Sequence, residues 1–336
     1  MAVRTRLWLL LHFLVAVNTT AHAEWFIHQK DLMGTRISVE VEHDDALHAQ
    51  TCAHRVFEEM ARIDQLMSSY RPTSEVSRIN QFAGQGEINI SPELSRLIEK
   101  SLHFSRLSQG AFDISYASIG HRYDYRRRIK PDDQTIDDIL PLVDYQDIKL
   151  NRQEIRLEHP GMRIDLGGIA KGYAVDRAIA VIGKCNIQNA RVSAGGDTRI
   201  MGDRSGRPWI IGIRHPRREK HYALRIPLFD VAFSTSGDYE RFFISNGERI
   251  HHIINPRTGK SATSSWSSTV IGADATSTDA LSTTLFILGA QKGIDLINTI
   301  PEFDAIIIDG SGQVHYSSGL ASADPQSSRN SGDPHD

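Results

Sequence analysis

The chain has 336 residues, of which 40% are hydrophobic and 24% are charged, and its formal net charge is −3. This length can bury the core of one or two domains, and the composition is that of an ordinary soluble globular protein. The weak net charge gives no general attraction to nucleic acid or to an anionic membrane, so no nucleic-acid partner is expected. The basic run RRRIK at 126–130 is interpreted as a solvated loop, because Pro131 and two aspartates follow it directly.

The first residues have the features of an export signal. Arg4 and Arg6 precede a mostly apolar stretch at 7–17, and a small-x-small triplet follows at 21–23. This order is typical of a secretory signal peptide, which is removed from the mature protein. The apolar stretch is too short to span a bilayer comfortably. We therefore predict a signal peptide at 1–23 and an exported, periplasmic protein.

The rest of the chain is predicted to form one domain followed by a tail. Residues 24–321 contain the periodic apolar segments and no internal repeat. Residues 322–336 are polar, and we expect them to be disordered, because they cannot bury enough apolar surface to offset the entropy of ordering.

Two cysteines, Cys52 and Cys185, are present. An exported protein can join such a pair in a disulfide. Because the sequence contains no geometry, the simpler interpretation, two separate buried thiols, is favoured here. Two cysteines by themselves do not make a metal site.

Apolar spacing predicts the helices of the first half. Apolar residues recur at steps of three and four within 45–69, which indicates a helix. Ser91 is a candidate cap for a second helix with an apolar stripe, and Gly110 is a plausible stop. The stretch RIDLGGIAKGYAVD at 163–176 then alternates, breaks at two glycines and continues with helical character. It is predicted to be a strand, a tight turn and a helix start, where backbone groups can face a ligand.

The second half is predicted to be rich in strands. A helix is expected at about 276–288, followed by another helix and two strands joined by a glycine turn. Because neither strict βαβ alternation nor a pure β pattern is present, we expect an α+β fold of antiparallel sheets with packed helices. Short apolar runs with nearby turn residues lie at 190–197, 209–214, 222–228, 231–237, 249–255 and 268–273.

A candidate metal site lies in the segment TSTDALSTTLFILG. Asp279 and Thr283 are four residues apart, so they share one face of the predicted helix. A carboxylate and a hydroxyl are hard oxygen ligands of the kind that Mg²⁺ prefers. An aspartate near a helix start is also common because it favours the helix dipole. Taken alone, the pair therefore leaves both interpretations open.

Two adjacent histidines, His251 and His252, lie in a predicted strand. Neighbouring residues in a strand point to opposite faces, so the two rings cannot readily bind one ion together. One of them is expected to face a site and the other solvent. A single histidine is more often structural than catalytic.

Two turns of small residues follow predicted strands, SAGGD at 193–197 and STSGD at 234–238. They let a planar or phosphate ligand approach the backbone, or they are simply tight loops. Neither is a G-x-S-x-G elbow, which gives serine hydrolase chemistry little support. The glycine break at 163–176 matches neither the G-x-x-x-x-G-K-[ST] phosphate loop nor the G-x-G-x-x-G dinucleotide motif.

Eight segments, taken together and in order, give the chain a clear resemblance. It resembles the ApbE family of FAD:protein FMN transferases from about residue 33 to about residue 318. The segments are MGTRISV (33–39), MSSYRPTSEVSRIN (67–80), GAFDIS (110–115), IDLGGIAKGYAVD (164–176), SAGGD (193–197), STSGDYERFF (234–243), HHIINPRTG (251–259) and TDALSTTLFILG (278–289).

The resemblance implies an activity. Members of this family cleave the pyrophosphate of FAD and transfer the FMN half to a threonine or serine hydroxyl of another protein. Their typical acceptors are flavoprotein subunits of membrane redox complexes, which would be transient partners. The alternatives are a Mg²⁺-dependent FAD pyrophosphatase that releases FMN and AMP, and a periplasmic flavin-binding protein without turnover.

The resemblance also implies roles for single residues. His252 matches a histidine implicated in transfer and is our candidate for the proton acceptor. The metal ligands would be the backbone carbonyl of Gly168 and the side chains of Asp279 and Thr283, which would hold Mg²⁺ beside FAD. The residues that the resemblance places around FAD are Met33, Tyr70, Ala111, Phe112, Asp113, Asp165, Lys171 and Ile253.

Overall fold

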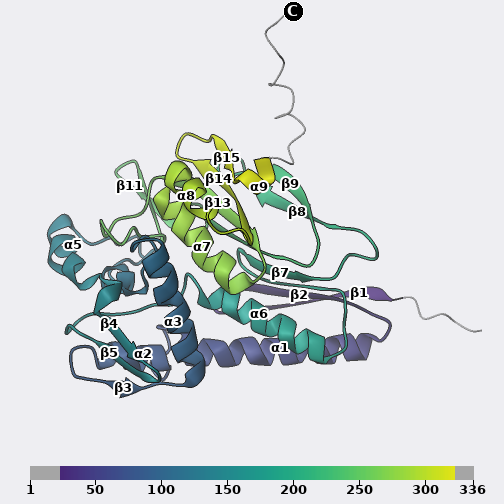
Figure 1. Ribbon diagram of the computed structural model, residues 1–336, viewed down its shortest axis with the longest axis horizontal. Coiled ribbons are helices and arrows are strands. Elements are labelled where there is room, and N and C mark those ends of the chain that lie inside the picture. The colour runs from purple at the N-terminus through teal and green to yellow at the C-terminus, as the bar shows by residue number, and fades with distance from the viewer. Residues whose placement is uncertain (1–22, 322–336) are drawn as a thin grey trace, which may run out of the picture.

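A computed structural model describes residues 23–321, so most of the predicted signal peptide and the whole predicted tail at 322–336 lie outside the described residues. An eight-stranded sheet, in which every neighbouring pair is antiparallel, forms the centre of the molecule (Figure 1). In spatial order its strands are β1 (Glu24–Leu32), β2 (Thr35–His43), β6 (Ala190–Ala194), β7 (Asp197–Met201), β10 (Ala232–Gly237), β13 (Ser265–Gly272), β14 (Phe303–Asp309) and β15 (Val314–Tyr316).

Helices cover one face of this sheet. α7 packs on β10 and β13, α6 packs on α7 and α1, and α8 packs on β14. The stripe predicted for the first helix is its buried face, since Val56, Met60 and Ile63 are fully buried. Burying each such side chain contributes roughly 1.5–3 kcal/mol. The four helices are α1 (Ala46–Met67), α6 (Ala170–Lys184), α7 (Ala275–Leu288) and α8 (Ala290–Ile297).

A hairpin of β8 (Trp209–Arg214) and β9 (Tyr222–Leu228) covers part of the opposite face. Trp209 is buried there against Trp25 of β1, with the two ring centroids 5.0 Å apart. Side chains of β6 alternate between the two faces of the sheet: Val192 belongs to the core under the helices, and Arg191 lies against the ring of Trp209 on the opposite face.

A smaller layer, formed by residues between α1 and α6, lies at the lower left of Figure 1. Its second long helix begins where the sequence predicted, with the Ser91 hydroxyl accepting from the backbone N–H of Leu94. The elements are α2 (Glu75–Gln81), β3 (Ile88–Asn89), α3 (Pro92–Leu107), α4 (Ala117–Gly120), α5 (Asp133–Ile139), β4 (Ile148–Asn151), β5 (Glu154–Leu157) and three short 3₁₀ turns at 114–116, 140–142 and 145–147.

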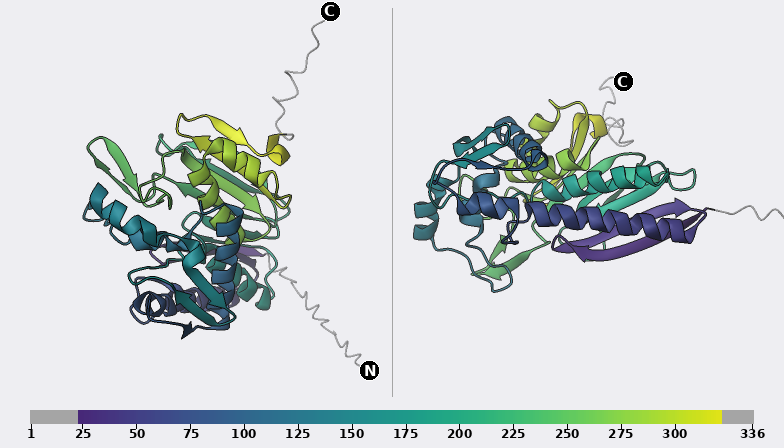
Figure 2. Two further views of the ribbon diagram at one scale, coloured as in Figure 1. Left: turned by 60° about the vertical axis from the view of Figure 1, so that its left-hand side comes forward. Right: turned by 90° about the horizontal axis from the view of Figure 1, so that it is seen from below.

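A second hairpin, of β11 (Phe242–Ser245) and β12 (Glu248–His251), forms a separate two-stranded sheet. It projects from the body on the side of α5, as the left view of Figure 2 shows. The described chain ends in a short helix, α9 (Ser318–Ala321). The α+β architecture of antiparallel sheets with packed helices is therefore confirmed.

Two local predictions are wrong. Residues before the glycine break do not form a strand, because the side chain of Asn80 bonds both the N–H and the C=O of Ile164 (2.7 and 2.9 Å) and takes the place of a neighbouring strand. The strand predicted at 249–255 ends at His251, where the chain bends.

The prediction of two separate thiols is also wrong, because Cys52 and Cys185 form a disulfide. Cys52 lies on the buried face of α1, and Cys185 is the C-cap of α6. Packing of these two helices brings together residues that are 133 positions apart in the sequence. This long-range contact has no local signal in the sequence.

Within residues 23–321, none of the helices combines the length and the apolar character needed to cross a bilayer.

Candidate functional site

The glycine break is held in place by a carboxylate. Asp165 Oδ1 accepts from the backbone N–H of Gly167 (2.7 Å) and from the hydroxyl of Tyr116 (3.2 Å). Asp165 Oδ2 accepts from the hydroxyl of Ser69. These bonds orient the turn just before α6, so Asp165 positions the break whether or not it also contacts a ligand.

Lys171, in the first turn of α6, lies between two buried aspartates. Its Nζ is 3.0 Å from Asp197 Oδ2 and 3.4 Å from Asp279 Oδ2, and it donates to the carbonyl oxygen of Gly167 (2.8 Å). The backbone N–H of Gly172 also donates to Asp279 (3.0 Å). The first turn of α6, the first turns of α7 and the start of β7 therefore meet at one point.

The charges in this cluster do not balance, because two carboxylates face one ammonium group. Burial and the negative charge of Asp197 raise the pKa of Asp279 to about 7, although Lys171 opposes the shift. Burial acts to lower the pKa of Lys171, but the two aspartates raise it above its ordinary value, so the ammonium group stays charged. A second ionised carboxylate is therefore disfavoured in this desolvated place unless another cation compensates it.

Two other predicted metal ligands, Gly168 and Thr283, also lie close together at the glycine break. A methyl group built on Gly168 would lie 3.5 Å from Thr283 Oγ1 and 3.2 Å from a ring carbon of Phe112. The Thr283 hydroxyl is 3.2 Å from the hydroxyl of Ser236 at the end of β10. Thr283 is one helical turn after Asp279, so both side chains reach the break from the same face of α7.

The residues present fit a divalent cation of the Mg²⁺ type. Asp197 Oδ2 is buried, and among residues 23–321 its only polar contact is the ammonium group of Lys171 at 3.0 Å, which it shares with Asp279. The surrounding donors are carboxylate, hydroxyl and carbonyl oxygens, the set that Mg²⁺ prefers. An added cation would compensate the second carboxylate and favour its ionised form.

The two histidines differ in their surroundings. His251 is buried, and its Nε2 bonds the carbonyl oxygen of Ala262 (2.7 Å), so it does not face solvent. His252 Nδ1 is buried without a hydrogen-bond partner in the described part of the chain. Burial, followed by the charge of Arg241, lowers the pKa of His252 to about 3. His252 is therefore neutral near pH 7, with an unused polar atom.

The segment 111–113 is a structural part of the site wall. Asp113 accepts from Ser115 N–H (2.8 Å) and Oγ–H (2.6 Å) and from Tyr145 N–H (2.9 Å). Burial nevertheless raises its pKa to about 6. Ala111 belongs to the same small apolar cluster as Ile253, so the structure brings these two predicted residues together.

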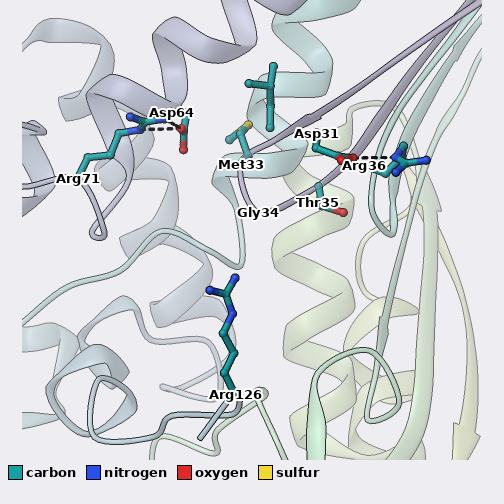
Figure 3. Close-up of a pocket in the computed structure, with 9 residues that line it drawn as sticks. Asp31, Met33, Gly34, Thr35, Arg36, Asp64, Arg71 and Arg126 are labelled. Atoms are coloured by element: carbon teal, nitrogen blue, oxygen red, sulfur yellow. Dashed lines mark hydrogen bonds and ion pairs between the residues drawn. The ribbon is translucent and has the colours of Figure 1, made fainter.

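Met33 lies apart from the carboxylate cluster, in the tight turn between β1 and β2. It adopts a left-handed conformation (φ 53°) and lines an open pocket of about 670 Å³ (Figure 3). Arg71 and Arg126 reach the same pocket from other segments, and Arg71 forms an ion pair with Asp64. Tyr70, beside Arg71, is 89% exposed, so it has room to cover a bound ligand.

Sequence reasoning missed two residues of this region. Asp197 ends the motif SAGGD, which the spacing predicts only as a turn; an acidic residue directly after two glycines is the signal that the sequence contains, and the structure buries its carboxylate. Arg241 Nη2 donates to the carbonyl oxygen of Gly34 (2.9 Å), and its own backbone oxygen accepts from His252 N–H (3.2 Å). Arg241 thus links the Met33 pocket to His252, a connection that spacing could not reveal.

Comparison with known proteins agrees with this geometry. The model of the ApbE family matches residues 33–307. A FAD:protein FMN transferase of Klebsiella pneumoniae is 31% identical over 284 residues, covering 82% of this chain and 87% of that protein. A FAD:protein FMN transferase of Treponema pallidum is 30% identical over 295 residues, covering 82% of each. The crystal structure of the ApbE protein of Thermotoga maritima has a TM-score of 0.81 and 32% identity, covering 88% of this chain and 98% of that one.

Proposed function

Because the chain belongs to the ApbE family, we propose that it is a Mg²⁺-dependent FAD:protein FMN transferase. The observation that carries the proposal is the meeting of Lys171, Asp279 and Thr283 at the glycine break. A cluster that combines hard oxygen ligands with a buried lysine suits a pyrophosphate substrate.

The proposed reaction exchanges one phosphorus–oxygen bond for another. The hydroxyl oxygen of an acceptor threonine or serine attacks the phosphorus on the flavin side of FAD. The bond from that phosphorus to the bridging oxygen breaks in line, and AMP leaves with the electron pair. The hydroxyl proton passes to a base, and the product is a phosphoester between FMN and the acceptor protein.

Mg²⁺ would be held by Asp279, Thr283 and the carbonyl of Gly168, with Asp197 beside them. When bound, it supplies charge neutralisation for the pyrophosphate. Lys171 contributes a fixed positive charge next to the same group.

His252 is proposed to take the hydroxyl proton. In the structure it is a weak base, because burial and Arg241 disfavour its charged form. A pyrophosphate placed beside the ring would favour the charged form and raise its basicity. Nδ1 of the ring is buried and has no hydrogen-bond partner in the described residues, so it would accept the bond from the acceptor hydroxyl once that hydroxyl has entered the buried site.

The partner and the compartment follow from the same proposal. A transferase needs a protein acceptor, and we propose a flavoprotein subunit of a membrane redox complex. The features of the first 23 residues support export to the periplasm, where such an acceptor would be met.

One incubation separates the proposed activity from its alternatives. The purified protein is mixed with FAD, Mg²⁺ and a cell-envelope extract of the source organism, and the products are analysed by mass spectrometry. We expect an acceptor protein to gain the mass of one FMN residue as AMP appears. Free FMN and AMP without a modified protein would indicate a pyrophosphatase, and unchanged FAD would indicate a binding protein.

A further inference from the structure

We propose that the acceptor protein docks, through an acidic extended segment, on a surface made of the loop 124–130 and the β11–β12 hairpin. We call it the acceptor surface. The inference rests on the proposed function and names the part of the chain that recognises the protein partner.

The acceptor surface adjoins His252 on two sides. The hydroxyl of Tyr125, in the loop, donates to the backbone oxygen of His251 (3.3 Å). His252 directly follows β12, and its N–H donates to the backbone oxygen of Arg241, the residue before β11. Arg126 lines the Met33 pocket, and Figure 3 shows its guanidinium group directed into that pocket. A polypeptide that brings a hydroxyl to His252 from outside would therefore pass over this surface.

The hairpin has an exposed apolar face, on which the guanidinium group of Arg249 lies over the Phe242 ring, 3.8 Å from its centroid. Phe243 points inward, where its ring lies 6.2 Å from that of Tyr125. Phe242 and Ile244 alternate with it and point outward, with exposed fractions of 40% and 55%. Figures 1 and 2 show this hairpin projecting from the body rather than packing against the sheet. Exposed apolar side chains on a short two-stranded sheet are typical of a surface that receives an extended segment.

The loop adds four cations, and two of them have no carboxylate partner among the described residues. Arg126, Arg127, Arg128 and Lys130 are all exposed. Arg127 lies 3.8 Å from Asp124, and Lys130 lies 4.0 Å from Glu248 of the hairpin. Across the described residues, no carboxylate lies within ion-pair distance of Arg126 or Arg128. The chain as a whole carries −3, so this local excess favours an acidic partner.

A sequence pattern alone gave the loop a different interpretation, that of a solvated basic run. The structure shows that this loop contacts the hairpin and lies beside the Met33 pocket, so its charges lie on the side of the molecule that faces the proposed site. Unpaired arginines around an exposed aromatic and aliphatic strip are the composition of a protein interface, in which charges at the rim select the partner.

Two substitutions test the surface, and each has a matched control in the chain. Ile244→Asp places a charge on the outer face of the hairpin, and Ile210→Asp does the same on β8, where Ile210 is 60% exposed in the other two-stranded sheet. Arg128→Glu reverses a loop charge, and Arg152→Glu does so in the β4–β5 turn. Arg128 and Arg152 are exposed arginines with nearly equal left-handed φ angles, 58° and 54°.

The measurements are the KM and kcat of FMN transfer to the acceptor found in the envelope extract, with the FAD dissociation constant and melting temperature of each variant. We expect Ile244→Asp and Arg128→Glu each to raise the KM for the acceptor about tenfold. FAD affinity should stay at the wild-type value, since neither residue lines the pocket or contacts the carboxylate cluster. Ile210→Asp and Arg152→Glu should behave like the wild type.

Other results would overturn the inference. It is wrong if both surface variants keep a wild-type acceptor KM while folding normally. A second contrary result is that vesicles rich in phosphatidylglycerol bind the wild type but not the two variants, while all three proteins transfer FMN to the soluble acceptor equally well. The surface would then face a membrane, and the inference would be wrong. If the wild type itself modifies no protein, the proposed function fails first, and this surface loses its acceptor with it.

Discussion

Lys171 has two buried carboxylates within 3.4 Å of its ammonium group, so a single lysine serves both Asp197 and Asp279. Burying charges without full compensation costs several kcal/mol, so such a cluster persists only where the surrounding structure holds it in place. Backbone groups hold this cluster in place: the N–H of Gly172 donates to Asp279, and the carbonyl oxygen of Gly167 accepts from Lys171. The residues of the proposed phosphate site are therefore arranged before a ligand arrives.

The role of the Thr283 hydroxyl can be tested by a substitution that conserves the shape of the side chain. Thr283→Val removes the hydroxyl proposed as a metal ligand, so the Mg²⁺ concentration for half-maximal transfer should rise about tenfold or more. Thr284→Val is the control, because among residues 23–321 the Thr284 hydroxyl bonds only the carbonyl of Ala280 within α7. Activity titrations with Mg²⁺ measure both. An unchanged Mg²⁺ requirement in Thr283→Val would contradict its role as a ligand.

His252→Asn should remove transfer while FAD binding is retained, since general-base help is typically ~10²–10⁴-fold. Transfer at the wild-type rate would exclude His252 as the base.

The same variant, His252→Asn, is also expected to change the stability of the protein in acid. The pKa of His252 is about 3 in the folded chain but about 6.5 in an unfolded one, so the unfolded state binds the proton first as the pH falls. The free energy of unfolding therefore falls as the pH is lowered from about 6.5 to 3. In His252→Asn this fall should be smaller, which urea denaturation at several pH values in this range would measure.

At the scale of elements, the site depends on how closely α6 approaches α7. A methyl group built on Gly172 would lie 2.0 Å from the carbonyl oxygen of Ala275 and 2.8 Å from Asp279 Cβ. Glycine lowers helix propensity by up to about 1 kcal/mol relative to alanine. The close approach explains its presence, because it lets the first turn of α6 present Lys171 directly to Asp279 on α7.

Gly172→Ala should therefore destabilise the protein by roughly 1–3 kcal/mol, and by more if the backbone cannot shift. Gly183, in the same helix, has no atom of the described chain within 4 Å of an added methyl group. Gly183→Ala should leave stability unchanged or raise it by up to about 1 kcal/mol, through helix propensity alone. Urea denaturation of the two variants measures the contrast. Equal effects would show that α6 and α7 are not in close contact.

On the scale of the whole molecule, the disulfide joins two helices that are far apart in the sequence. Cys52 on α1 and Cys185 at the end of α6 enclose the entire smaller layer, from α2 to β5, in one covalent loop. The glycine break and Lys171 lie inside this loop, close to its second cysteine in sequence. A staple of this kind suits an exported protein, in which thiols are oxidised.

The double substitution Cys52→Ala with Cys185→Ala should lower the free energy of unfolding by about 2–5 kcal/mol. Reducing agent should lower the melting temperature of the wild type and leave that of the double variant unchanged. Calorimetry with and without the reductant makes the comparison. A wild type that is insensitive to reduction under denaturing conditions would contradict a stabilising role for the bond.

The sequence alone determined the features that depend on local periodicity and composition. Residues 45–69 and 276–288 predicted α1 and α7 nearly to their ends, because an amphipathic or apolar helix repeats its signal every turn. The predicted strands at 209–214 and 222–228 match β8 and β9. Eight ordered motifs also identified the family, with Asp279 and Thr283 as its candidate ligands.

Only the tertiary structure decided what lies next to what. Asp197 joined the site beside Lys171, Cys52 paired with Cys185, and the loop at 124–130 met the β11–β12 hairpin. The last two contacts each span more than a hundred residues. Asn80 replaced a strand partner for Ile164 in the same way. Such contacts follow from how helices and sheets pack over one core, and a pattern of neighbouring residues does not record them.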